Sequence, residues 1–144
     1  MYRKLDGAFF CCVAWYEPRH PDERKLILPW AYGRLGPSTD WHRKMPAGPR
    51  PLLGIEEYVT DSGASPVLIV EGEKTREAAK RLAGEKFFVT TWSGGCLSID
   101  KTDFRILDGA VIYIWPDADE PGVQAATRIA EILTQYTHRP KSFS

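Results

Sequence analysis

The sequence has few cysteines, no excess of either charge and no long apolar run. Its three cysteines, Cys11, Cys12 and Cys96, form neither the paired pattern of a zinc site nor the framework of a disulfide-rich domain. No apolar stretch approaches the roughly 20 residues that a membrane-spanning helix needs. We therefore expect a protein of the reducing cytoplasm that has no contact with a membrane.

Charge gives no overall indication of a partner, because 19 lysines and arginines balance 19 aspartates and glutamates. Hydrophobic residues make up 43% of the chain and charged residues 26%, which is close to the averages of soluble domains. The length of 144 residues suits one ordinary domain, or one α/β domain with a small appendage. Any argument for nucleic acid must come from local clusters of basic residues.

The most informative stretch is AVIYIWPDADEPG, residues 110–122, in which an apolar run ends abruptly in acids, prolines and a glycine. A run without polar alternation is typical of a strand covered on both faces in a parallel sheet. Asp117 and Asp119 are two residues apart, so an extended chain places both carboxylates on one side. Such a pair suits Mg²⁺, which keeps several waters and accepts phosphate oxygens. An acidic turn that caps the next helix explains the same residues equally well.

A second apolar strand, residues 67–70, also ends in an acid, Glu71. Ligands of open α/β sheets bind at the carboxyl ends of the strands, so we expect Glu71 near Asp117 and Asp119. Helices are expected at residues 75–83 and 123–136, because apolar residues recur there at helical spacing.

Residues 86–92 are expected to form a further strand, which ends in Ser93-Gly94-Gly95. These glycines either let backbone N–H groups approach a phosphate or only supply a turn with positive φ. Cys96 follows them, and no histidine lies nearby in the sequence to activate its thiol.

The first part of the chain predicts an antiparallel hairpin from residues 9–16 and 25–30. Between residues 24 and 50, one acid, Asp40, stands against six basic residues, with aromatic residues interleaved. The basic residues are Arg24, Lys25, Arg34, Arg43, Lys44 and Arg50, and the aromatic residues are Trp30, Tyr32 and Trp41. This combination is typical of grooves for single-stranded nucleic acid. The alternative is a solvated loop whose tryptophans pack underneath.

The segments VLIVEGEK, VTTWSGG and VIYIWPDADEPG, in this order, resemble the Toprim domain shared by topoisomerases and primases, and most closely the primases of phages and plasmids. The resemblance covers roughly residues 66–133, and residues 2–53 are similar to the small β-rich segment that precedes Toprim in such primases. It implies an α/β fold with a mostly parallel sheet flanked by helices. Residues 1–60 would be the β-rich basic and aromatic segment, and residues 61–144 the Toprim domain.

The resemblance implies a DNA primase that joins nucleotides on single-stranded DNA with Mg²⁺ or Mn²⁺. Nucleoside triphosphates would be substrates, and a replicative helicase would be a partner. It assigns three sets of residues: Glu71, Asp117 and Asp119 to catalysis and metal binding; Lys74, Gly94 and Gly95 to the triphosphate; and Trp30, Arg34, Trp41, Arg43, Lys44 and Arg50 to the nucleic acid. A Toprim nuclease that activates water, and a non-catalytic module that binds nucleic acid or a replication partner, remain alternatives.

Two features depart from the family pattern. Thr75 stands where many relatives carry an acid. The family also has another strand after the last helix, but residues 136–144 are polar and contain Pro140, which would interrupt a ladder. We therefore expect a fragment of a longer replication protein, with weak activity of its own, that self-associates through an exposed strand edge or is marginally soluble.

Overall fold

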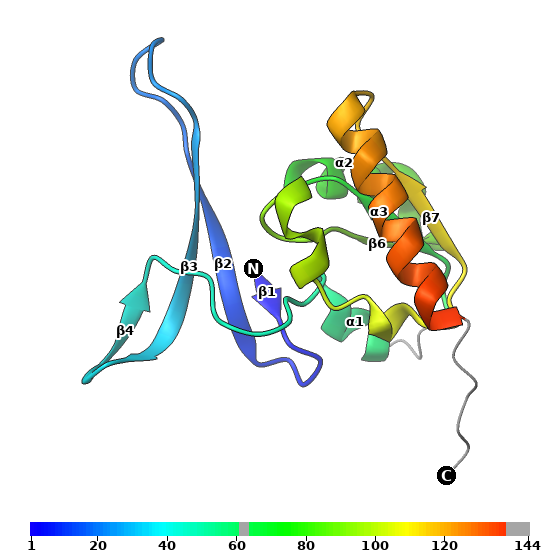
Figure 1. The fold of residues 1–144 in the computed structure, drawn as a ribbon, viewed down its shortest axis with the longest axis horizontal. Helices are drawn as coiled ribbons and strands as arrows, with labels where there is room; N and C mark the ends of the chain where they lie inside the picture. Colours follow the sequence, from blue (N-terminus) through cyan, green and yellow to red (C-terminus); the bar gives the residue numbers. More distant parts are fainter. Residues whose placement is uncertain (61–63, 138–144) are drawn as a thin grey trace.

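The computed structural model describes residues 1–60 and 64–137 and contains two separate sheets (Figure 1). The first is antiparallel, with strands in the order β1-β2-β3-β4, and the second is parallel, in the order β6-β5-β7. The strands are β1 Tyr2–Arg3, β2 Phe9–Tyr16, β3 Leu26–Leu35, β4 Ser38–His42, β5 Val67–Val70, β6 Phe88–Thr90 and β7 Ile112–Trp115. The helices are α1 Ile55–Thr60, α2 Glu73–Ala83 and α3 Glu120–Thr137, with short 3-10 helices η1 Gly84–Lys86, η2 Cys96–Lys101 and η3 Arg105–Leu107.

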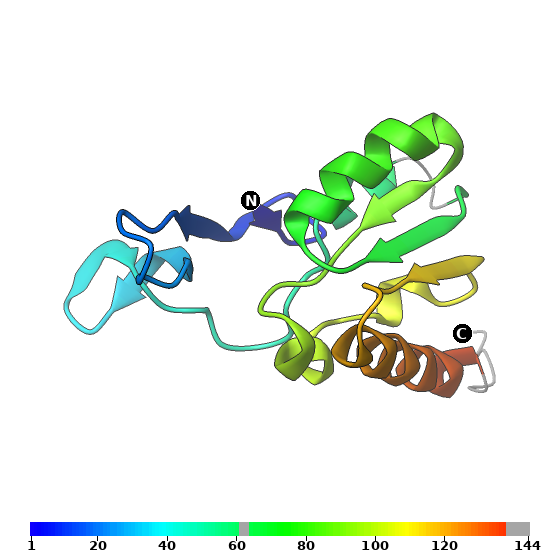
Figure 2. The same ribbon diagram turned by 90° about the horizontal axis from the view of Figure 1, so that it is seen from above.

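The predicted hairpin at the start of the chain is confirmed, because β2 pairs antiparallel with β3. The sequence did not predict β4, which pairs with β3 after a turn at Gly36, where φ is 66°. We call residues 9–44, which include β2, β3 and β4, the arm, because they extend away from the parallel sheet in Figures 1 and 2.

The parallel sheet lies between two helices, α2 on one face and α3 on the other (Figure 2). Val67 and Ile69 of β5 are fully buried and pack with Ile129 of α3. On the opposite face, Val70 packs against Ala79 of α2. This alternation along β5 buries both faces of the strand, which explains its uninterrupted apolar sequence. The predicted α/β fold with a parallel sheet flanked by helices is therefore confirmed.

The prediction that the strand before the acids is covered on both faces is wrong. Ile112 and Ile114 pack against the core beneath α3, whereas Tyr113 and Trp115 on the other face are 53% and 55% exposed. The reason is that α2 packs on β5 and β6 and stops short of β7. The middle strand of the described sheet is β5, so β7 is an edge strand.

The expected buried faces of the two helices also need correction. Val123 and Leu82 belong to the apolar patterns that predicted the two helices, but they are 56% and 80% exposed. In the described part of α3 the buried side chains are those of Ala125, Ile129 and Ile132, and Gly122 is buried beneath the acidic loop. In α2, Leu82 is in the last turn and points away from the core that Ala79 joins.

The open edge of β7 bears on the expected self-association. Among the described residues no strand pairs with its outer side. Residues 138–144, where a further strand was considered, and residues 61–63, where the two segments were divided, lie outside the described part. Self-association through this edge and the division at residue 60 both stay predictions. Within residues 1–60 and 64–137, no helix combines the length and the apolar character needed to cross a membrane.

Candidate active site

Glu71 lies immediately after β5, at the carboxyl end of the parallel sheet. Gly72 turns the chain there with φ of 83°, and its N–H donates a hydrogen bond to Thr91 Oγ1 at 3.0 Å. The left-handed conformation at this position favours glycine. The turn after Glu71 is therefore fixed to the loop that follows β6.

Cys96 contacts Glu71, and the sequence did not predict this contact. Its Sγ donates a hydrogen bond to Glu71 Oε1 at 3.2 Å and lies 4.0 Å from the Pro121 carbonyl oxygen in the first turn of α3. The hydrogen bond to Glu71 raises the pKa of the Cys96 thiol, and burial and the charges of Glu71 and Asp119 raise it further. Cys96 therefore stays protonated near neutral pH, which argues against a reactive thiolate.

The structure supports the capping role for Asp119. Its Oδ1 accepts a hydrogen bond from the Gly122 N–H at 2.8 Å, as an N-cap residue of α3 would. Asp117, two residues earlier, is exposed. A Cβ built on Gly122 would lie 2.5 Å from the Asp117 carbonyl oxygen, so the acidic loop folds tightly over the start of the helix. Capping uses one oxygen of Asp119 and leaves the other for a ligand.

Cys96 lies between the two acidic strand ends, because its Sγ contacts Glu71 Oε1 on one side and the Pro121 carbonyl oxygen, two residues after Asp119, on the other. Among the described residues, no group of three histidine, cysteine or acidic side chains is arranged so that it could hold one metal ion. The donors nevertheless fit Mg²⁺ or Mn²⁺, because such ions are commonly held by one or two carboxylates while water and substrate phosphates complete the shell. Asp117 and Asp119 would be the ligands, with Glu71 beside them.

The residues assigned to the triphosphate lie in two places. Lys74 is in the first turn of α2, where its Nζ lies 3.7 Å from Glu17 Oε1 of the arm and 5.0 Å from the centre of the Trp15 ring. Gly94 and Gly95 are exposed, with φ of 91° and 65°. Both glycines therefore form a turn with positive φ, and their contact with a phosphate stays a prediction.

Arg50 was grouped with the arm, but the structure places it beside the glycine turn. Its Nη1 donates to the Ser93 carbonyl oxygen at 3.2 Å, and a Cβ on Gly94 would lie 2.7 Å from the same nitrogen. The hydroxyl of Ser93 is buried and has no hydrogen-bond partner among the described residues. Arg50 therefore adds a positive charge beside the glycine turn that precedes Cys96.

The other proposed nucleic-acid residues lie on the arm. Trp41 and Tyr32 are half exposed and pair across β3 and β4, with ring centres 5.5 Å apart. Arg34, Arg43 and Lys44 are exposed near them in the sequence. Trp30 differs from Trp41, because it is partly buried where β3 pairs with Cys12. The arm thus presents one aromatic pair and several cations to solvent.

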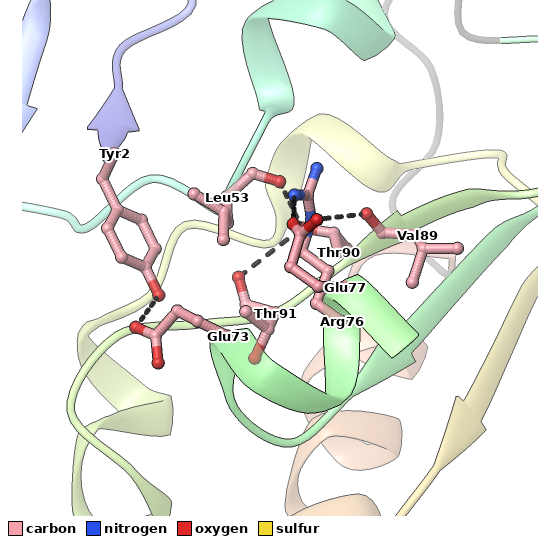
Figure 3. A network of polar contacts seen from close by, with 8 residues as sticks. All are labelled: Tyr2, Leu53, Glu73, Arg76, Glu77, Val89, Thr90 and Thr91. Carbon is pink, nitrogen blue, oxygen red and sulfur yellow. Dashed lines mark hydrogen bonds and ion pairs between the residues drawn. The ribbon is translucent and has the colours of Figure 1, made fainter. Parts of the chain in front are cut away.

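A network of polar contacts joins the first residues of the chain to α2 (Figure 3). The buried Tyr2 hydroxyl donates to Glu73 Oε1 at 2.8 Å, two residues after Glu71. Burial raises the pKa of Tyr2 far above its usual value, and the charge and hydrogen bond of Glu73 raise it further. The β-rich segment is therefore anchored directly beside the strand end that carries Glu71.

The buried Arg76 extends this network along α2. Its Nε donates to the Val89 carbonyl oxygen at 2.8 Å, and its Nη1 forms an ion pair with Glu77 at 2.9 Å. The Thr90 hydroxyl donates to the Leu53 carbonyl oxygen at 2.9 Å. The contacts of Arg76 with Val89 and of Thr90 with Leu53 were not predicted, because each joins two segments that carry no shared local pattern.

Comparison with known families gives one match. The family model described as the Toprim domain matches residues 66–143, which is more than half of the chain. Neither the curated proteins nor the solved structures gave a match.

Proposed function

Because the chain belongs to the Toprim domain family, which is found in primases, nucleases and topoisomerases, we propose that it is the catalytic core of a DNA primase. It would join nucleotides on single-stranded DNA with Mg²⁺ or Mn²⁺. The observation that supports the proposal most directly is the position of Cys96, whose Sγ donates a hydrogen bond to Glu71 Oε1 and lies 4.0 Å from the Pro121 carbonyl oxygen, two residues after Asp119. The exposed cations and aromatic rings of the arm add a surface suited to a single strand.

In the proposed reaction, the 3′ oxygen of one nucleotide attacks the α-phosphorus of a nucleoside triphosphate. The new oxygen–phosphorus bond forms as the bond to the β-phosphate breaks, and pyrophosphate leaves. Glu71 would take the proton of the 3′ hydroxyl through Oε2, because Oε1 is engaged by Cys96. Asp117 and Asp119 would hold the metal ion, which when bound neutralises charge on the phosphate and orients the attacking oxygen.

The finer parts of the proposal rest on the resemblance of VLIVEGEK and VIYIWPDADEPG to phage and plasmid primases. They are the phage or plasmid origin and a replicative helicase as partner. The proposed cytoplasmic location rests instead on the three cysteines, which form no disulfide framework. A Toprim nuclease would use the same carboxylates to activate water, so the choice between the two enzymes lies in the nucleophile. The experiment below distinguishes them by product.

We expect Asp117→Asn to weaken Mg²⁺ and Mn²⁺ binding at least about tenfold, because it removes one of two carboxylate ligands from a shell that water and phosphate complete. Titration calorimetry measures the binding. An assay with a single-stranded DNA template and labelled nucleoside triphosphates should show fewer products from the variant than from the wild type.

The control is Asp22→Asn, which removes an exposed acid in the loop between β2 and β3. It should bind metal and form product like the wild type. Shortening of a labelled template in place of new product would favour the nuclease. Equal metal affinity in the wild type and Asp117→Asn would contradict the assignment of this loop.

The arm should supply most of the affinity for single strands. Replacing both Arg43 and Lys44 with alanine should reduce the slope of log K against log salt by about 0.7 for each lost phosphate contact. Fluorescence anisotropy of a labelled oligonucleotide at several salt concentrations measures this slope. A matched control, Lys80→Ala with Arg81→Ala, removes two exposed cations from the last part of α2. Equal salt slopes in the two double variants would argue against the arm as the main binding surface for single strands.

A further inference from the structure

We propose that Lys25 and Lys74 form a binding site for a phosphate group of the nucleic-acid substrate, and that Glu17 occupies this site when no phosphate is bound. The inference deepens the proposed function and rests on it. The Toprim resemblance assigns Lys74 alone to the triphosphate, and the inference adds Lys25 and Glu17 and places the site between the arm and α2.

The site is built from three segments that the fold brings together. Trp15 lies near the end of β2 and Lys25 just before β3, while Lys74 belongs to the first turn of α2. Lys25 Nζ lies 4.1 Å from the centre of the Trp15 ring, and Lys74 Nζ lies 5.0 Å from it. One aromatic side chain therefore holds two ammonium groups in the same neighbourhood through cation–π attraction.

One carboxylate oxygen lies near both ammonium groups. Glu17 Oε1 is 3.8 Å from Lys25 Nζ and 3.7 Å from Lys74 Nζ. Two like charges this close repel each other unless an anion lies between them, and Glu17 is that anion in the free protein. A phosphate oxygen of a nucleic-acid strand is also an ionised acceptor, with one negative charge per phosphate, so it can take the place of the carboxylate oxygen between the two ammonium groups.

Glu17 is well suited to being displaced. Its side chain is 67% exposed and that of Lys74 is 69% exposed, so both groups remain hydrated and their ion pair contributes little to stability. With Glu17 in place the three groups carry one net positive charge, and without it they carry two. A phosphate therefore finds a stronger positive field once Glu17 has moved aside.

The position of Lys74 connects this site to the reaction. Lys74 is the residue after Glu73, to which Tyr2 donates its hydrogen bond, and it is three residues after Glu71. A single strand of nucleic acid that lies along the arm and reaches Glu71 at the end of β5 would pass Lys25 and Lys74. The same pair could instead meet the phosphates of an incoming nucleoside triphosphate, since the chemistry of recognition is shared.

The test compares Glu17→Gln with the wild type in binding to a labelled single-stranded oligonucleotide and to a nucleoside triphosphate, each titrated at several salt concentrations. Removal of the competing carboxylate should raise the affinity about threefold to fivefold at 0.1 M salt, and should steepen the salt slope by about 0.7. A gain for the oligonucleotide alone identifies a strand phosphate, and a gain for the triphosphate alone identifies the nucleotide. Asp22→Asn, which removes an exposed acid elsewhere in the same loop, should leave both affinities unchanged.

A second variant separates a binding site from a purely structural link between the arm and α2. Lys25→Ala with Lys74→Ala should lower the salt slope by about 1.4, and adding Glu17→Gln to this pair should then have no effect on binding. If Glu17→Gln leaves both affinities unchanged or lowers them, while the lysine variant only lowers the melting temperature, the inference is overturned. The arm experiment with Arg43 and Lys44 is independent of this result, so each proposal can fail without the other. Absence of binding to either ligand in the wild type overturns both.

Discussion

Replacement of Gly122 by alanine is expected to abolish binding of Mg²⁺ and Mn²⁺. A Cβ at this position would lie 2.5 Å from the Asp117 carbonyl oxygen and 3.0 Å from Asp119 Oδ1. A backbone oxygen cannot rotate away, so the whole acidic loop has to move and both carboxylates move with it. Alanine favours a helix over glycine by about 1 kcal/mol, but overpacking of this kind costs about 1–3 kcal/mol. The clash therefore outweighs the gain in propensity.

Calorimetric titration of the metal and thermal unfolding of the variant would check this expectation together. Gln124→Ala is the matched control, because Gln124 is exposed in the same part of α3 and its side chain bonds only the neighbouring Glu120. The control should keep wild-type metal binding and stability. A Gly122→Ala protein that binds metal as tightly as the wild type would show that the capped loop is not the metal site.

The sequence predicted those parts of the fold that are encoded in short, continuous stretches. The apolar runs before Glu71 and before Asp117 became the parallel strands β5 and β7, and both acids lie at strand ends. For β5 the reason is that a strand covered by helices on both faces needs apolar residues throughout, and in both cases a turn that contains glycine or proline follows the strand. The order of these stretches was enough to indicate a Toprim domain.

The lateral order of the strands and the extent of each helix were not encoded in this way. Tyr113 and Trp115 have the residue types of a covered strand, yet they are exposed because α2 lies over β5 and β6. Coverage of a strand depends on the length and position of a helix elsewhere in the chain. A local pattern cannot supply that information.

The carboxylates of the candidate site were predicted, but their supporting contacts were not. Cys96 bonds Glu71 across 25 residues, and Tyr2 bonds Glu73 across 71 residues. Arg50 lies beside Gly94 and away from the basic residues of the arm, with which its position in the sequence grouped it. Contacts at such separations follow from the packing of the two segments, for which a single sequence has no periodic signal.

Alkaline pH is expected to destabilise the protein through Tyr2, whose side chain is buried and donates to Glu73. Burial raises the pKa of Tyr2 well above its usual value near 10, and the carboxylate of Glu73 adds to this effect. The unfolded chain releases the phenol proton near pH 10, whereas the folded chain retains it. The stabilisation that the protonated phenol of Tyr2 provides is therefore complete below about pH 10. Above that pH, this group lowers the free energy of unfolding by about 1.4 kcal/mol for each pH unit.

The variant Tyr2→Phe should separate this effect from the rest of the fold. At neutral pH it should lower the free energy of unfolding by about 1.5–3 kcal/mol, because a hydrogen bond to a charged acceptor is lost. Above pH 10 the curves of wild type and variant should converge, since the wild type loses the same advantage. The variant keeps part of the slope, because burial raises the pKa of Cys11 to about 11 and also raises that of Tyr58. Urea unfolding followed by circular dichroism between pH 7 and 11 would measure both curves.

Tyr16→Phe provides the matched control, because Tyr16 lies at the end of β2 and its side chain is 45% exposed. It should change neither the stability at neutral pH nor the alkaline slope. If the Tyr2→Phe and wild-type curves instead run parallel above pH 10, the phenol of Tyr2 does not lose its proton on unfolding. The link between the first strand and α2 would then contribute no pH dependence, and the anchoring of the β-rich segment beside Glu71 would have to rest on the contacts of Leu53 with Thr90 and Thr91.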